Sequence, residues 1–186
     1  MKYFLTETTP EVASIPAGAQ VFARGENLMI GIGEKARFEA SGENRFQDLA
    51  KQFAEFSKEV EIIGEIESSA GSINALAAIS FSPDSAFKSS LVVPESMLII
   101  RRDKTWIASF EENFKWPEED QLKPQKLEWR QGQQTQEGFM NSVRQALGQI
   151  DDGEISKVVL ARDLISDKPA EFDIRQAISK LRQRFP

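Results

Sequence analysis

A chain of 186 residues with 40% apolar and 28% charged side chains has the composition of a globular protein with a packed core. Its 29 acidic and 23 basic residues give a formal charge of −6, and the basic residues are scattered, so we expect no nucleic-acid partner. Cysteine and histidine are absent, which excludes disulfides, thiolate nucleophiles, imidazole ligands and Ser-His-Asp catalysis.

An acid or base must therefore be Lys, Asp, Glu or Tyr3. The apolar run at Met1 is too short for a signal peptide, and no later run is long enough to span a bilayer. We expect a soluble, cytoplasmic protein with no membrane partner.

The first part of the chain predicts a β-hairpin. Residues 6–18 are small, polar and rich in proline, which indicates an irregular lead-in. Residues 19–24 and 28–32 are strand-like and flank a turn with Gly25, so a hairpin is the simplest prediction. Residues 35–40 are a candidate third strand.

A helix is predicted to follow, with Asn44 as its N-cap. Its expected core-facing stripe consists of Phe46, Leu49, Ala50, Phe53 and Phe56.

Four further segments have strand-like composition. Residues 61–66 and 73–81 predict two strands of one sheet. After a turn at 80–86, residues 95–102 and 105–110 predict a hairpin whose second strand places Trp106, Ala108 and Phe110 on one face.

Residues 111–134, with two prolines and five glutamines, predict a long surface loop or linker. Trp116 and Trp129 within it either pin the loop to the domain or offer a partner surface, and pinning is the simpler interpretation.

Thr135 is placed to cap a helix whose apolar stripe ends at Ile150, and Gly153 predicts the turn after it. The β-branched run that follows, ending near Ser166, predicts a strand buried on both faces. In a strand, Lys157 shares one face with Ile155, Val159 and Ala161. Such a lysine either reaches water at the strand edge or lies among apolar neighbours. A last helix is predicted after Asp173.

Several segments together resemble the chorismate-utilising enzymes, and among them the isochorismate synthases. Residues 78–83 and 91–96 resemble that family's Phe-x-Pro turn and its later Pro-Glu strand start. The segment 153–162, Gly-Glu-Ile-Ser-Lys-Val-Val-Leu-Ala-Arg, resembles the family more specifically, and it follows the predicted helix 139–150. The segment at 93–96 resembles the siderophore-pathway enzymes more than the menaquinone-pathway ones.

The resemblance implies an α+β fold with antiparallel-rich sheets and packed helices, an incomplete part of the fold of anthranilate synthase component I. Residues 1–186 would be the amino-terminal part of one chorismate-binding domain. The general-acid glutamate, the acidic ligands of Mg²⁺ and the substrate-binding arginine of the family would lie beyond it. We therefore expect a truncated chain that is inactive alone and able to self-associate through open sheet edges.

In the family reaction, water adds at C2 of chorismate while the C4 hydroxyl leaves. The resemblance implies that Lys157 is the base. A solvated lysine is almost wholly protonated at neutral pH, so this role requires burial, which disfavours the ammonium. Relatives that use ammonia typically carry glutamine at this position, whereas salicylate synthases share the lysine and remain an alternative.

Two further interpretations stay open. Arg162, on the strand face opposite Lys157, is interpreted as a structural ion-pair partner. The chain is alternatively a non-catalytic binding or assembly module that uses its exposed tryptophans.

Overall fold

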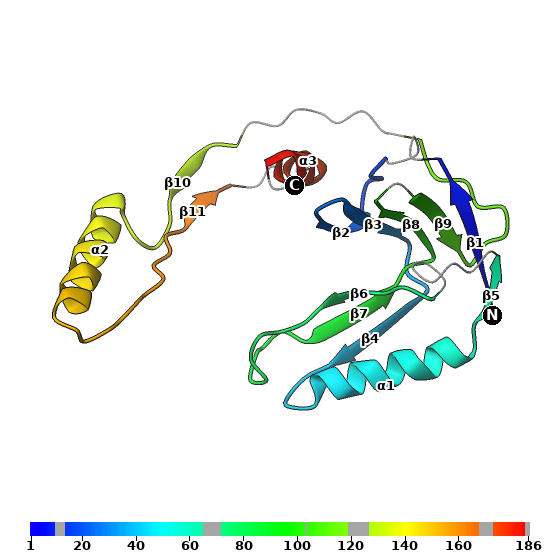
Figure 1. The fold of residues 1–186 in the computed structure, drawn as a ribbon, viewed down its shortest axis with the longest axis horizontal. Coiled ribbons are helices and arrows are strands. Elements are labelled where there is room, and N and C mark those ends of the chain that lie inside the picture. Colours follow the sequence, from blue (N-terminus) through cyan, green and yellow to red (C-terminus); the bar gives the residue numbers. More distant parts are fainter. Residues whose placement is uncertain (10–13, 65–71, 103, 119–126, 168–172, 185–186) are drawn as a thin grey trace. The chain divides into compact units, whose positions relative to one another are not determined.

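The structure is a computed structural model that describes residues 1–9, 14–64, 72–102, 104–118, 127–167 and 173–184 (Figure 1). The chain divides into two compact units. The first unit comprises Met1–Leu122 together with Arg175–Pro186, and the second comprises Lys123–Ile174.

A six-stranded sheet forms most of the first unit (Figure 1). Its order is β2 (Gln20–Arg24), β3 (Asn27–Ile32), β8 (Ser96–Arg101), β9 (Lys104–Ser109), β1 (Lys2–Thr8) and β5 (Glu61–Gly64). All neighbours are antiparallel except β1 and β5, which are parallel. The predicted β2–β3 and β8–β9 hairpins are both confirmed, and Gly25 turns the first with φ +56°.

A second, three-stranded sheet has the order β4 (Ala36–Ala40), β7 (Ser89–Val93) and β6 (Leu76–Ala78). The prediction that residues 61–66 and 73–81 share one sheet is wrong, because β5 pairs with β1 and β6 pairs with β7. The prediction that residues 6–18 are irregular is wrong at residues 6–8, which belong to β1. Neither β1 nor β7 was predicted as a strand from the sequence. Composition indicates that a segment is extended but does not select its neighbour.

Both faces of the six-stranded sheet are covered, as alternation along β8 shows. Met97 and Ile99 lie in one apolar cluster with Tyr3 and Trp106, and Phe53 and other partly buried side chains pack against it. The intervening Leu98 lies in a second cluster on the other face with Leu28, Ile30 and Trp116. The expected face of β9 is confirmed: Trp106 and Ala108 are buried, and Phe110 packs against them.

Helix α1 (Arg45–Lys58) packs on the three-stranded sheet, against β4 and β7. Leu49 is buried as predicted. Phe46 is 54% exposed and not part of the core, and the guanidinium of Arg45 lies over its ring. The predicted capping role of Asn44 is also wrong, because its side chain makes no cap hydrogen bond. The carbonyl of Asn44 still accepts the amide of Asp48, at 2.9 Å.

Trp116 pins its loop to the first unit, as predicted. It is 7% exposed, and its indole N–H donates to the carbonyl oxygen of Ser14 at 3.0 Å. Part of the predicted linker, residues 119–126, lies outside the described residues. Trp129, by contrast, is 61% exposed.

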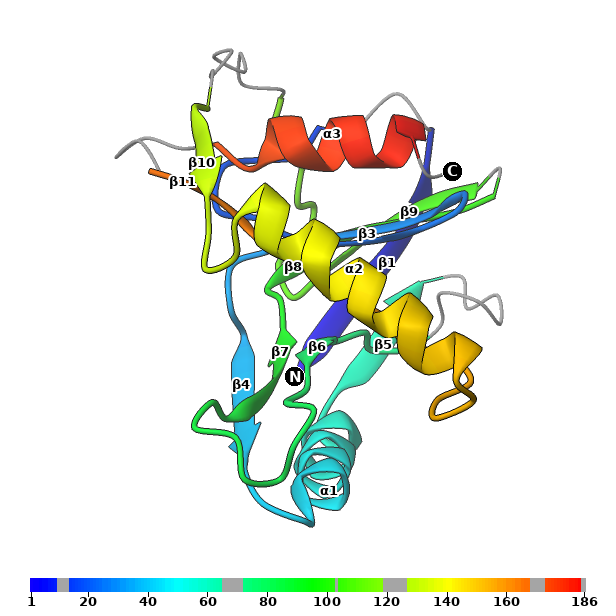
Figure 2. The ribbon, with the colours of Figure 1, turned by 90° about the vertical axis from the view of Figure 1, so that its left-hand side faces the viewer.

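Helix α3 (Arg175–Arg184) completes the first unit, at the opposite end from α1 (Figure 2). The guanidinium of Arg175 donates from Nη1 to the carbonyl of Ile15 at 3.0 Å. Among the described residues, no helix combines the length and the apolar character needed to cross a bilayer.

The second unit contains α2 (Gln136–Asp151) and the antiparallel pair β10 (Trp129–Gln131) and β11 (Leu164–Ser166). Thr135 caps α2 as predicted, since its hydroxyl accepts the amide of Gly138 at 3.0 Å. The expected class, α+β with mostly antiparallel sheets, is therefore confirmed across both units.

Candidate functional site

The segment that carries Lys157 leaves the C-terminus of α2 through a tight turn. Gly153 adopts φ +73°, the left-handed conformation that glycine favours after a helix. The amides of Glu154 and Ile155 both donate to the carbonyl of Gln149, which closes the end of the helix. The predicted turn after Ile150 is thus confirmed, with the helix continuing to Asp151.

Beyond the turn, residues 155–163 form no strand, and the prediction of a buried strand here is wrong. Lys157 is exposed, Val158 is 45% exposed and Val159 is 94% exposed. A strand needs a neighbour to accept its backbone hydrogen bonds and to cover its side chains. No described strand pairs with this run, and β11, which follows it, pairs with β10.

The far end of the segment is fixed by Asp163. Its carboxylate accepts the amide of Gln133 at 3.1 Å, and its carbonyl accepts the amide of Gly132 at 3.3 Å. These bonds tie the segment to the turn that precedes α2. Lys157 therefore lies on a stretch of chain whose two ends are anchored and whose middle is uncovered.

Arg162 lies next to this anchor and is partly buried. Its Nε is buried and finds no hydrogen-bond acceptor within the described part of the chain. The expected structural ion pair is not among the salt bridges that the structure shows for the described residues. The role of Arg162 stays a prediction.

The segment offers one amine and a run of exposed apolar side chains. A lysine in water is a poor base, so this geometry alone does not provide base catalysis. Within the described residues, no three Asp, Glu, His or Cys side chains lie close enough together to hold a metal ion. These residues therefore do not fit a magnesium site.

The anchoring role of Asp163 could not be predicted from local sequence. Its partners lie 30 residues away in the chain, and no local spacing connects an aspartate with a distant turn. The one indirect signal is Gly132, where a side chain would collide with the Asp163 carboxylate. Glycine is common in polar turns whatever packs against them, so the signal is weak.

A family model described as "Chorismate binding enzyme" matches residues 105–186. The matched range includes all of α2, Lys157 and Arg162. The match covers less than half of the chain, and it agrees with the resemblance carried by residues 153–162. No curated protein and no solved structure matches the chain.

Proposed function

We propose that this chain is part of an isochorismate synthase, which isomerises chorismate by adding water at C2 and releasing the C4 hydroxyl. The observation that carries the proposal is the family match over residues 105–186 together with lysine at position 157. In the family, lysine at this place accompanies water as the nucleophile. The siderophore-pathway type and a cytoplasmic location are part of the proposal.

Lys157 would accept a proton from the attacking water. That role needs a neutral amine, and desolvation is the physical means of obtaining one. The apolar neighbours Val158, Val159 and Leu160 supply part of such a surrounding, although all three are exposed in this structure. The proposal therefore requires that residues 157–160 be covered when the enzyme works.

Magnesium is implied by the resemblance and remains a proposal. The described residues form no metal-binding cluster. Chorismate, a dicarboxylate, is the small-molecule substrate that the family implies.

The test is conversion of chorismate by the protein in its full genomic length, with products separated by chromatography. We expect isochorismate, and we expect Lys157→Ala to lower kcat by about a hundredfold or more. Lys51→Ala, on the exposed side of α1, is the matched control and should leave kcat unchanged. A wild-type rate in Lys157→Ala would contradict the role of Lys157.

Salicylate synthase is the nearest alternative, because it would share the lysine. It adds a pyruvate elimination, so salicylate and pyruvate would replace isochorismate as final products. An amino-substituted product that appears only with ammonia would assign the chain to the ammonia-using relatives instead.

A non-catalytic binding or assembly module is the alternative of another class. The exposed Trp129 is the observation that favours it, because tryptophan is enriched at protein interfaces, where its apolar ring is covered. Two results together would favour the module. The full-length protein would convert no chorismate, and Trp129→Ala would alter its oligomeric state in size-exclusion chromatography.

A further inference from the structure

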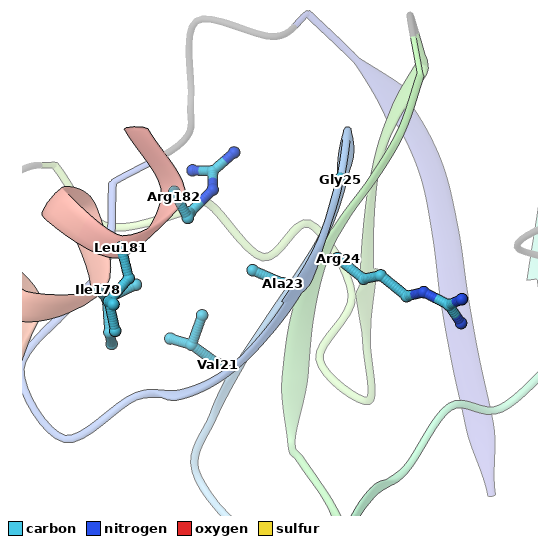
Figure 3. Close-up of a pocket in the computed structure, with 7 residues that line it drawn as sticks. All are labelled: Val21, Ala23, Arg24, Gly25, Ile178, Leu181 and Arg182. Carbon is cyan, nitrogen blue, oxygen red and sulfur yellow. The ribbon is translucent and has the colours of Figure 1, made fainter. Parts of the chain in front are cut away.

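A pocket of about 270 Å³ lies between α3 and the β2–β3 hairpin, entirely within the first unit (Figure 3). Its volume is slightly below the range of about 300–1,000 Å³ that is usual for drug-sized ligands. A ligand here would therefore be small.

The inner surface of the pocket is apolar. Val21 and Ala23 point toward α3 from one face of β2, and Ile178 and Leu181 point toward them from the helix (Figure 3). Leu181 stays 56% exposed. Apolar surface between the helix and the strand thus stays exposed to water. An apolar group of a ligand bound there would cover that surface.

The position of α3 beside this surface is held by Arg175. The residue is 9% exposed, and its guanidinium donates to the carbonyl of Ile15 at 3.0 Å. A buried arginine that binds a backbone carbonyl is costly to displace. The pocket is therefore formed between two anchored elements before any ligand arrives.

The described residues that line the pocket carry charge of one sign. Arg182 lies at the rim, and none of the described lining residues has a carboxylate side chain. The other lining arginine, Arg24, extends from the opposite face of β2, away from α3 (Figure 3). Among the described lining residues, the guanidinium of Arg182 alone is thus placed to meet a group bound against Val21 and Leu181. A guanidinium preferentially binds carboxylates and phosphates.

We propose that this pocket binds a small organic carboxylate with an apolar body, the body between β2 and α3 and the carboxylate at Arg182. The proposal does not depend on the proposed chorismate chemistry, since it uses none of residues 153–162. It also assigns Arg182 a role beyond offsetting the negative end of the α3 dipole.

The test is titration of the ¹⁵N-labelled chain with benzoate, followed by NMR, with benzyl alcohol as the uncharged comparison. We expect saturable shifts confined to amides of β2, its turn and α3, and weaker binding of benzyl alcohol. Shifts spread over the whole chain, or no saturation, would overturn the proposal. Equal affinity for the two probes would show that charge plays no part and would overturn it too.

Three variants sharpen the result, and all three replace exposed residues, so the fold should persist. Arg182→Ala should weaken benzoate binding roughly three- to fivefold, as expected for an ion pair at an exposed rim, and leave benzyl alcohol unaffected. Arg24→Ala is the matched control and should change neither affinity. Ala23→Leu should fill the pocket and reduce binding of both probes. Equal losses in Arg182→Ala and Arg24→Ala would contradict the assignment.

Discussion

The carboxylate of Asp163 occupies the space that a side chain at Gly132 would need. A Cβ atom at Gly132 would collide with the carboxyl carbon and both oxygens of Asp163. The same carboxylate accepts the amide of Gln133, so it cannot move aside without losing that bond. This close approach ties the segment that carries Lys157 to the start of α2.

Gly132→Ala should therefore destabilise the second unit by about 1–3 kcal/mol, the usual cost of overpacking. Gly148→Ala is the matched control: it lies within α2 with no atom near its prospective Cβ, so it should stabilise by up to about 1 kcal/mol. Urea unfolding followed by circular dichroism measures both. Equal effects of the two substitutions would contradict the packing of Asp163 on Gly132.

Arg45 should be a larger contributor to stability than its position at the start of a helix suggests. It is 7% exposed and donates to the carbonyls of Gly42, Ser80 and Phe81. Arg45→Met would remove the side-chain donor from the carbonyls of Ser80 and Phe81, while the Gly42 carbonyl keeps the backbone amide of residue 45, and should cost about 2–3 kcal/mol.

Limited proteolysis supplies a local measurement for the same variant, because the loop at 80–88 should become more susceptible to cleavage. Arg37→Met is the control, since the pair of Arg37 with Glu34 is exposed and should change little. A loop that is cleaved no faster in Arg45→Met than in the wild type would refute the anchoring role.

Tyr3 predicts a pH dependence. Burial raises the pKa of its phenol well above the ordinary value of about 10, because the buried phenolate would be desolvated. The resulting stability is present below pH ~10, where tyrosine is neutral in both states, and is lost as the pH rises toward the folded-state pKa. Tyr3 is the one tyrosine of the chain, so the tyrosinate absorbance reports on it alone. Ionisation near pH 10 with the fold intact would contradict its burial.

Tyr3→Phe separates the ring from the hydroxyl. The hydroxyl has no hydrogen-bond partner in the described part of the structure, while the ring packs on Phe110 with centroids 4.7 Å apart. Removing an unpaired buried hydroxyl should leave the free energy of unfolding unchanged or raise it by about 1 kcal/mol. Tyr3→Ala should lower it by about 3–5 kcal/mol. A clear loss in Tyr3→Phe would reveal a bond to the hydroxyl.

The predictions that were confirmed rest on local signals, although the local signal for a cap at Asn44 was wrong. Both hairpins and the Thr135 cap could be predicted because turn residues and caps act over a few positions. Sheet membership could not: the neighbours of β5 and β6 are decided by packing between distant segments. The β-branched run at 155–162 shows the same limit, since its alternation indicates a strand but no described segment pairs with it. For the candidate site, the sequence indicated Lys157 but not the anchor at Asp163.

The solvent exposure of residues 155–162 can be tested by substitutions in this chain. Val159→Asp should change the free energy of unfolding by no more than about 0.5 kcal/mol, because the side chain is 94% exposed. Val93→Asp, at a fully buried position, should be severely destabilising. A large loss in Val159→Asp would show that this run is covered, as the alternation of the sequence predicts.

The proposed function is tested most directly by following oxygen during the reaction. The full-length protein would convert chorismate in water enriched in oxygen-18, and mass spectrometry would locate the label in the product. Because water adds at C2 while the C4 hydroxyl leaves, we predict isochorismate that carries one labelled oxygen, at C2, and product formation at least about a hundredfold slower in Lys157→Ala. Isochorismate without label, or an amino-substituted product formed only with ammonia, would contradict water activation at Lys157.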